Sequence, residues 1–518
     1  MKNIQYILIV VTALLVTASL PAAEYDGTVR AGYVFTDLEG NLGVNQPTFN
    51  LYDGLALSLE RFRYQWDNGM RLTGDLRNIT MNNRRLALGL ARPGLGGVTI
   101  RHTAYRRSYD FDDTRFTRRR TTNGSLWVQP IQYVKLFGGF GVTEKHGSSL
   151  GLFETDGFSS IGKVDYLNQF ANVGVEFKKK RRLARVEYRT SDYSDDFEAT
   201  GDRSSQCVRL TAYTPVPSFD DVVLSGGFQH YEHEVVDRSD TLTANTVWGA
   251  AKYTHKLGYH AKYSFLFDRA RHTGDISATD NISQSIQIGK NWRSRGGIMF
   301  GYRYHLNDDV YDERSGSGYS LSGWLVPTQR LTLRAGLNFD EDNVDAGRTL
   351  TGNREYSRHW LSVRYRYSNL FVRAKLEDRR RDNDDIGSSV DLVRFSGDLS
   401  VTRAEYGELT VSYAYGTGEY KNSAGTFEYE EHVLSGEVTS REYRRVQAGF
   451  GGVYYRGRQD VDVESFEVKF TGKHRLLETA ILEVIYSAHN FDNMADSSVP
   501  YREYYTANVV QANIIFEL

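Results

Sequence analysis

Apolar and polar residues alternate along most of this chain, and this two-residue period constrains the fold more than any other feature of the sequence. Residues 259–269 show the pattern clearly. One set of alternate positions there is apolar: Tyr259, Ala261, Tyr263, Phe265 and Phe267. The opposite set is polar except at Leu266: His260, Lys262, Ser264 and Asp268. Similar runs of about ten residues recur, which is the length at which a tilted strand crosses a bilayer.

A helical membrane span is not expected, because no run of eighteen apolar residues occurs beyond residue 23. The mean hydropathy of −0.50 is also too polar for a helical membrane protein. In a membrane β-barrel only alternate residues meet lipid, so a polar composition remains compatible with a membrane location. The sequence therefore predicts an all-β protein, a transmembrane antiparallel β-barrel with short periplasmic turns and longer extracellular loops.

The first 23 residues have the features of a secretory signal peptide. Lys2 gives the positive start, residues 4–20 are mostly apolar, and Pro21-Ala22-Ala23 offers small residues for cleavage. A transmembrane anchor is the alternative, but no basic flank follows. We expect residues 24–518 to form one barrel domain in the outer membrane of a Gram-negative bacterium. Without Lys2 the chain carries 62 basic and 65 acidic residues, and this near-neutral balance argues against a nucleic-acid partner.

Counting the alternating runs predicts twenty-six strands, within a range of 22–26. The first thirteen lie near residues 25–36, 55–66, 70–79, 84–91, 97–107, 121–129, 133–143, 164–177, 183–190, 204–213, 221–232, 244–253 and 259–269. The others lie near residues 281–291, 297–306, 317–326, 331–339, 355–367, 370–379, 389–401, 408–416, 427–439, 444–456, 462–472, 476–489 and 502–518. We expect Tyr263 and Leu333 to face lipid and Arg334 to face the interior.

The connections alternate between short and long. Short turns are predicted at 67–69, 178–182, 254–258, 293–297, 327–330, 368–369 and 472–475. Longer polar stretches occupy 37–54, 108–120, 144–163, 191–203, 340–354, 380–388 and 490–501. Short turns are typical of the periplasmic rim and long loops of the outside, so both ends of the barrel domain are expected in the periplasm. A soluble β-solenoid or sandwich is the alternative that the alternation leaves open.

The last residues of the chain form an apolar face that resembles the C-terminal signal of outer-membrane barrels. Its residues are Val510, Ala512, Ile514, Phe516 and Leu518. The final residue is Leu518 where the usual signal has an aromatic residue. The resemblance implies recognition of this strand by the barrel assembly machinery.

No catalytic or metal-binding group emerges from the sequence. His230 and His233 fall on opposite faces of a strand, so they are not expected to share a metal ion. Acidic runs at 307–309 and 382–385 lack a calcium-ligand spacing, which leaves divalent bridging to lipopolysaccharide as the alternative to solvated loops. Cys207 has no second cysteine to pair with. The sequence also lacks a convincing Ser/His/Asp set, so we do not expect an enzyme.

Basic residues recur at two kinds of position. Arg115 and Arg118 to Arg120 lie in a predicted external loop, where guanidinium groups can bind lipid phosphates or simply be solvated. Others fall on the polar faces of strands and are candidates for contacts with a partner or with ions inside the barrel: Arg101, Arg185, Arg209, Lys262, Arg303, Arg334, Arg364, Arg366 and Arg373.

The predicted strand number sets the width of the barrel. Sixteen to eighteen strands leave an aqueous channel and twenty-two enclose a plugged lumen, so about twenty-six strands enclose a wider space. An open hole of that width would leak the periplasm. The first predicted strand begins directly after the signal, and no predicted loop much exceeds twenty residues, so we expect a separate protein inside the barrel.

This organisation resembles the MtrB/PioB type of outer-membrane porin, found in porin–cytochrome complexes. The resemblance rests on size, strand number, the expected absence of a plug, and Tyr/Arg-rich hairpins such as residues 301–309. Some members carry an N-terminal Cys-x-x-Cys, which this chain lacks. The resemblance implies a multihaem c-type cytochrome inside the barrel, with haem on that partner and no cofactor on this chain. A general or substrate-specific diffusion porin remains the alternative.

Overall fold

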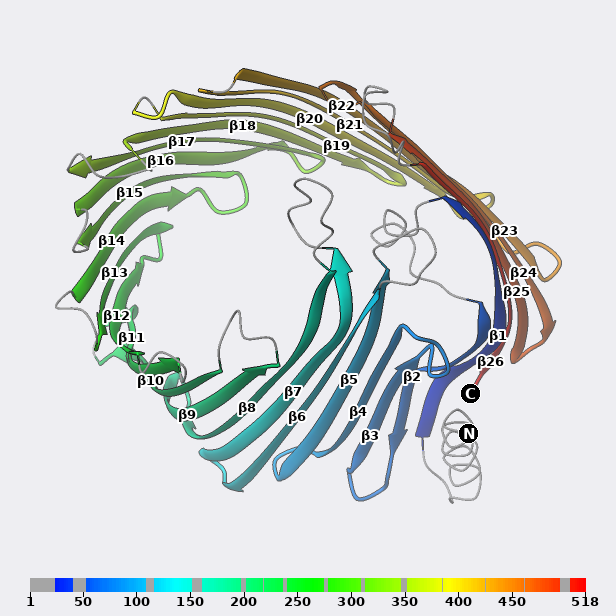
Figure 1. Ribbon diagram of the computed structural model, residues 1–518, viewed down its shortest axis with the longest axis horizontal. Helices are drawn as coiled ribbons and strands as arrows, with labels where there is room; N and C mark the ends of the chain where they lie inside the picture. The colour runs from blue at the N-terminus through cyan, green and yellow to red at the C-terminus, as the bar shows by residue number, and fades with distance from the viewer. Residues whose placement is uncertain are drawn as a thin grey trace.

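The computed structural model contains one closed antiparallel barrel of 26 strands (Figure 1). It describes residues 24–40, 53–108, 116–150, 161–196, 202–217, 219–235, 240–273, 278–308, 313–345, 352–383, 385–423, 425–460, 462–493 and 504–518. The predicted fold class and strand number are confirmed. The predicted signal peptide lies outside the described residues. Among the described residues, no helix is both long and apolar enough to cross a membrane.

The strands of the first half are β1 (Glu24–Gly40), β2 (Gly54–Gln65), β3 (Arg71–Arg77), β4 (Arg84–Arg92), β5 (Gly96–Ser108), β6 (Phe116–Ile131), β7 (Val134–Leu150), β8 (Ile161–Lys179), β9 (Arg182–Asp195), β10 (Arg203–Val216), β11 (Phe219–Val235), β12 (Asp240–Thr254) and β13 (Tyr259–His272). Those of the second half are β14 (Ala278–Asn291), β15 (Gly296–Asp308), β16 (Glu313–Thr328), β17 (Leu331–Asp345), β18 (Arg354–Tyr367), β19 (Leu370–Asn383), β20 (Ser388–Arg403), β21 (Gly407–Asn422), β22 (Gly425–Ser440), β23 (Val446–Gln459), β24 (Val463–Leu477), β25 (Ala480–Asn493) and β26 (Tyr504–Glu517).

Each strand pairs with its neighbours in the sequence, and β1 pairs with β26 to close the ring. The connections that follow even-numbered strands are short, as predicted, and we assign them to the periplasmic side. The turn after β2 shows why its sequence suits a tight connection. Gly69 has a φ of 79° that favours glycine, and the Asn68 side chain accepts a hydrogen bond of 2.9 Å from the Met70 amide.

The strands extend further than predicted at their other ends, which we assign to the extracellular side. β6 begins at Phe116 rather than near residue 121, and β17 continues to Asp345 rather than residue 339. One predicted turn is also wrong: residues 472–475 belong to β24, and the connection to β25 is 478–479. Both errors arise where polar residues continue the ladder beyond the apolar belt, so hydrophobic alternation no longer marks the strand.

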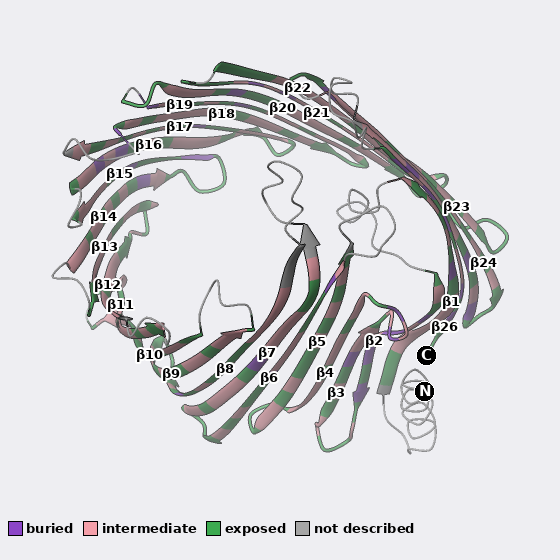
Figure 2. Ribbon diagram, viewed as in Figure 1, coloured by how far each residue is buried: buried purple, intermediate pink, exposed green. Residues whose placement is uncertain are grey.

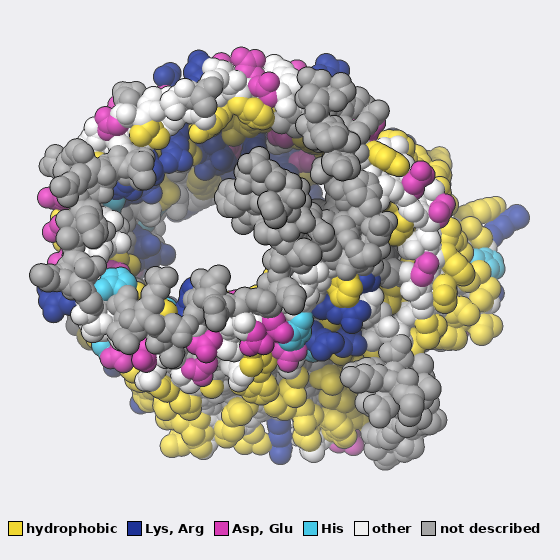
Figure 3. Space-filling model, viewed as in Figure 1, with side chains coloured by type: hydrophobic (Ala, Val, Ile, Leu, Met, Phe, Trp, Pro, Cys, Tyr) yellow, Lys and Arg dark blue, Asp and Glu magenta, His cyan; other side chains and the backbone are white. Residues whose placement is uncertain are grey.

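The two faces of the sheet follow from the register, because directly paired residues lie on the same face. Tyr263 pairs with Ile286, which pairs with Tyr302, and the row continues to Tyr319 and Phe339. Figure 3 shows hydrophobic side chains on the outside of the wall and Lys and Arg on the inside. The row of Tyr263 therefore faces lipid.

The wall is a single layer, so most side chains stay partly exposed and a large core is absent from the described residues (Figure 2). One small buried cluster of Val34, Ala56, Met81 and Val509 lies beside the junction of β1 and β26, on the lumenal face. Stability therefore depends mainly on the backbone ladder and on contacts between neighbouring strands.

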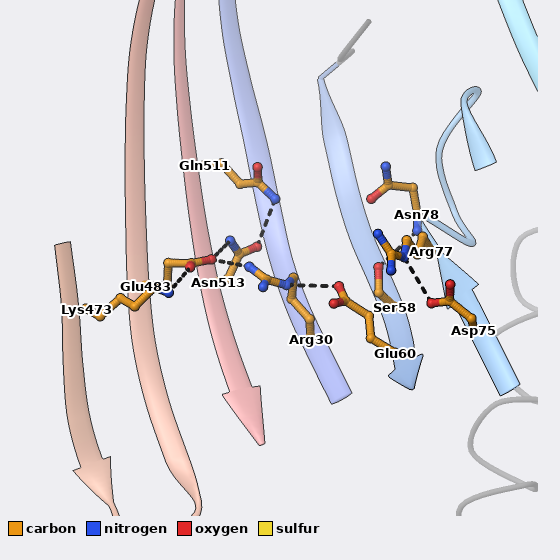
Figure 4. Close-up of polar contacts among 10 residues, drawn as sticks. All are labelled: Arg30, Ser58, Glu60, Asp75, Arg77, Asn78, Lys473, Glu483, Gln511 and Asn513. Carbon is orange, nitrogen blue, oxygen red and sulfur yellow. Dashed lines mark hydrogen bonds and ion pairs between the residues drawn. The ribbon is translucent and has the colours of Figure 1, made fainter. Parts of the chain in front are cut away.

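A polar network crosses the closing junction on the lumenal face (Figure 4). Glu483 on β25 is 3% exposed and forms an ion pair with Arg30 of β1. Its carboxylate also accepts a 3.0 Å hydrogen bond from Asn513 of β26 and lies 3.5 Å from Lys473 of β24. Arg30 in turn lies 3.3 Å from Glu60 of β2. The network thus links five consecutive strands across the point of closure.

The depth of a lipid-facing residue in the bilayer should decide how much a charge there lowers the free energy of unfolding. Leu333 is only two residues from the start of β17, so it lies near the periplasmic interface, whereas Leu337 lies six residues in and is 41% exposed. We expect Leu337→Arg to destabilise the barrel by about 2–4 kcal/mol and Leu333→Arg by about 0–1 kcal/mol. Urea unfolding from vesicles measures both. The lumenal substitution Arg334→Leu is the control, and a larger cost for it than for Leu337→Arg would contradict the facing assignment.

Glu483→Gln should weaken closure, because it removes the charge that Arg30 and Lys473 share. Hydrogen bonds to charged groups contribute about 1.5–3 kcal/mol, and we expect a loss of that size in the free energy of unfolding. Urea unfolding in vesicles measures it. Asp398→Asn, which weakens a lumenal pair with Arg373 away from the junction, is the matched control. Equal losses would show that the closing junction has no special role.

Candidate functional site on the lumenal wall

The nine basic residues predicted to face the interior lie on the lumenal face. Each belongs to the set of alternate positions opposite the exposed apolar residues: Arg209 lies between Val208 and Leu210, and Arg334 follows Leu333 on β17. The structure brings four of the nine together on β17, β18 and β19: Arg334, Arg364, Arg366 and Arg373. Arg185 and Arg209 lie close to each other, whereas Arg101, Lys262 and Arg303 lie apart on β5, β13 and β15. Their contacts with a partner or with ions stay a prediction.

The four neighbouring arginines belong to a larger group that we call the cationic field. Its members on β17 to β20 are Arg334, Arg358, Arg364, Arg366, Arg373, Lys375, Arg379 and Arg394. Arg364 and Arg373 are directly paired across β18 and β19. Figure 3 shows Lys and Arg side chains on the inner wall in the upper part of the view, where these strands lie.

A buried carboxylate lies at the centre of the cationic field. Glu377 is 4% exposed and lies 3.0 Å from an Arg358 Nη atom. Lys375 and Arg379, two residues away on either side along the same strand, also form ion pairs with Glu377. Since three cations share one carboxylate, the group keeps a net positive charge while its side chains are held in place.

In the part of the cationic field nearest the periplasm, fewer carboxylates balance the positive charge of the arginines. Arg373 lies 2.6 Å from Asp398. Within the strands that the structure describes, no carboxylate lies within ion-pair distance of Arg334, Arg364 or Arg366. These three lie close to the short connections 329–330 and 368–369. The field thus presents uncompensated positive charge at the periplasmic mouth of the lumen.

The other predicted residues differ in how their charge is balanced. Arg185 lies 2.7 Å from Glu187, and Arg303 lies 2.6 Å from Asp340. Arg209 is directly paired with Glu187 and its guanidinium stacks on Trp248 at 5.0 Å from the ring centroid. Lys262 is paired with a second cation, Lys252. Cationic side chains therefore recur around the lumen, but among the described strands only β17 to β20 gather them into a continuous surface.

The strands after the cationic field carry acidic side chains on the same face. Glu408, Glu431, Glu437 and Glu467 lie on the lumenal positions of β21 to β24, where β24 also carries Lys469 and Lys473. Arg394 of the field approaches Glu431 at 3.9 Å, where the two regions meet. The lumen is therefore electrostatically asymmetric, which allows a bound partner to be oriented as well as attracted.

Four members of the cationic field were not predicted from the sequence: Arg358, Lys375, Arg379 and Arg394. For three of them, the spacing from predicted lumenal arginines already indicated the lumenal face. Arg358 is six residues before Arg364, and Lys375 and Arg379 are two and six residues after Arg373. These even spacings place them on the lumenal face of strands that alternation already predicts.

Metal binding finds no support in the described residues, which contain no group of three or more His, Cys, Asp or Glu placed to hold an ion. The pairing places His230 on the lipid-facing side and His233 on the lumenal side, as the two-residue period predicts. Cys207 lies on the lumenal face, half-buried and paired with Tyr231. The predicted assembly residues Val510, Ala512, Ile514 and Phe516 lie on the lipid-facing side of β26, with Leu518 just beyond it; their recognition stays a prediction.

No family model and no curated protein sequence matches this chain. Several solved structures do. The siderophore receptor PirA from Pseudomonas aeruginosa has 12% sequence identity and a TM-score of 0.50, covering 82% of this chain and 80% of that receptor. The ferric-catecholate import receptor Fiu from E. coli K12 has 10% identity and a TM-score of 0.52, covering 95% and 82%. The copper transporter OprC has 10% identity and a TM-score of 0.50, covering 96% and 80%.

At these identities the likeness concerns the fold. Together with the closed ring of strands, it identifies the protein as a β-barrel of the Gram-negative outer membrane, as the sequence predicted.

Uncompensated lumenal cations should make the refolded barrel selective for anions. We expect its chloride permeability in planar bilayers to exceed its potassium permeability, and the triple substitution of Arg334, Arg364 and Arg366 by Gln to bring the ratio closer to one. High salt should reduce the difference, because it screens exposed charge. Arg380→Gln, on the lipid-facing side of β19, is the control. A triple variant with unchanged selectivity would contradict the role assigned to the cationic field.

Proposed function

We propose that this barrel sheathes a separate protein that carries a row of c-type haems, so that electrons cross the outer membrane inside it. The MtrB/PioB resemblance of the sequence supports this proposal. The observation that carries it is the closed ring of 26 strands, in which every described residue belongs to the wall or to a connection of a few residues. The wall encloses a wide lumen without itself providing a reaction centre among those residues.

The width of the ring suits a protein occupant. With strands about 4.8 Å apart and tilted by about 40°, a ring of this number has a diameter of about 50 Å between opposite backbones. Side chains on both walls reduce the free width to about 30 Å. A spherical domain of 100 residues, with a radius of gyration of about 13 Å, has a diameter of about 34 Å, so the space admits a folded domain that is elongated along the barrel axis.

The charge of the lumen indicates the character of such an occupant. The cationic field is least compensated near the periplasmic mouth, at Arg334, Arg364 and Arg366, and a partner from the periplasm would meet this region first. Surface carboxylates complement these guanidinium groups, and haem propionates that reach the surface carry the same charge. We therefore infer a partner with an acidic flank toward β17 to β20.

In this proposal the haem belongs entirely to the partner. This sequence has a single cysteine, Cys207, and no Cys-x-x-Cys-His motif for haem attachment. The barrel would exclude lipid from the haem chain and hold the partner across the membrane, and would carry out no chemistry itself.

A second candidate function is uptake of a small anionic solute. It is favoured by the uncompensated cations of the lumen and by the names of the similar structures, which are receptors and a transporter. A diffusion porin or an import receptor would use the cationic field to attract the solute rather than a protein.

Isolation from native membranes in mild detergent distinguishes the two functions. We expect haem-staining protein to remain bound in a fixed ratio. Vesicles with this complex should reduce or oxidise an electron carrier on the opposite side, and vesicles with the refolded barrel alone should not. Substituting Arg334, Arg364 and Arg366 by Gln should weaken partner retention about tenfold, since exposed ion pairs contribute about 0.2–1 kcal/mol each.

Arg380→Gln, on the outer face, should leave partner retention unchanged. A haem-free native preparation with a steady, charge-selective conductance would contradict the proposed sheath and favour the uptake of solutes.

A further inference from the structure

Four arginines form a patch on the outer face of the wall, at the extracellular ends of β4, β5 and β6. Arg84 is paired with Ala104, which is paired with Arg120, and the next row places Arg106 opposite Arg118. All four continue the alternate positions of the exposed, lipid-facing residues Leu88, Ile100 and Leu126. We call these four residues the outer arginine patch.

This position corrects the interpretation of the basic run in the sequence. Arg118, Arg119 and Arg120 were expected in an external loop, but they belong to β6, and alternation turns Arg119 toward the lumen. Arg115 lies outside the described residues. The patch instead gains Arg84 and Arg106 from the neighbouring strands, which a search for runs of basic residues does not find.

The height of the patch corresponds to the outer lipid headgroups. Ten residues separate Gly96, where β5 begins beside a periplasmic turn, from Arg106. At about 3.4 Å per residue and a tilt of about 40°, these residues rise about 26 Å, which matches the height of about 25 Å of the apolar band of such barrels. Figure 3 shows the same order on the outer wall, with charged side chains above the hydrophobic belt.

The patch concentrates positive charge in a small area. Arg106 and Arg118 are directly paired across β5 and β6, which places two like charges side by side. Both guanidinium groups stack on Phe116, at 4.1 and 5.3 Å from the ring centroid. Glu144 lies 3.9 Å from Arg120, but it also lies 3.7 Å from His146.

The shape of the surface provides room for a headgroup. Arg84, Arg118 and Arg120 line one hollow together with His102, Thr122 and Glu144. His102 is held there by a 2.9 Å hydrogen bond between its Nδ1 and the Thr122 hydroxyl. Several guanidinium groups thus converge on one open site, which is the arrangement that recognises phosphate through paired hydrogen bonds.

Other parts of the outer rim have the opposite charge. The lipid-facing positions at the extracellular ends of β16, β17 and β18 carry Glu313, Glu341 and Glu355. Carboxylates there would need a divalent cation to bind an anionic lipid, whereas arginines bind phosphate directly. The patch is therefore a distinct sector of the rim.

We propose that the outer arginine patch binds the phosphate groups of lipopolysaccharide in the outer leaflet, so that one glycolipid occupies a defined site beside β4 to β6. The site lies on the opposite face of the wall from the cationic field and does not depend on what fills the lumen.

Native mass spectrometry of the full barrel in detergent with EDTA tests this site. We expect the protein to bind bisphosphorylated lipid A at least tenfold more tightly than the same lipid after removal of its phosphates. Substituting Arg106, Arg118 and Arg120 together by Gln should abolish this preference. Substituting Arg456 and Arg458, which face lipid at the extracellular end of β23, should leave it unchanged.

Equal binding of the two lipids to the wild-type barrel in EDTA would overturn the proposal, even if the triple variant fails to fold. An equal loss in the β23 control would also overturn it, since the effect would then come from rim charge in general. Competition by millimolar inorganic phosphate as strong as that by lipid A would assign the site to free phosphate rather than to the lipid.

Discussion

The rest of this structure depends on one constraint: the backbone N–H and C=O groups at the two edges of the sheet need hydrogen-bond partners. Lipid offers no partner for an unpaired N–H or C=O group, so a sheet can cross the membrane only when its first and last strands meet. Here β1 pairs with β26 from Thr28 to Gly40, and Arg30 and Glu483 join the two sides of that junction. Closure also requires opposite strand directions at the junction, which an even number of antiparallel strands provides.

Because the sheet is closed, one of its faces contacts lipid and the other faces the lumen. Because successive side chains alternate, each strand supplies lipid with one half of its residues and the lumen with the other half. A residue such as Leu337 and its neighbour Asn338 are adjacent in sequence but belong to environments that differ in dielectric constant. The free energy of a substitution is therefore set by its face and by its height in the membrane.

The near-neutral charge of the whole chain conceals a strong separation of charge in the folded protein. The chain has a net charge of −2, yet the lumenal positions of β17 to β20 are mainly cationic. Acidic residues are frequent at the outer rim, as at Glu313 and Glu341, with the outer arginine patch as a cationic sector. A net charge predicts the solubility of a chain, but a barrel exposes separate surfaces, each of which attracts its own partner.

Sequence alone determined the strand number, most of the short turns and the face of most residues, because hydrophobic alternation marks each crossing of the apolar belt. It could not locate the outer ends of strands such as β6, where polar residues continue the ladder in water. Only the tertiary structure decided the register: which strands place Arg364 opposite Arg373, and which cations reach Glu377. The physical reason is that alternation has a period of two residues and repeats along every strand. It fixes which face a side chain occupies, whereas the register between neighbouring strands, which depends on where each turn begins and ends, fixes its neighbours.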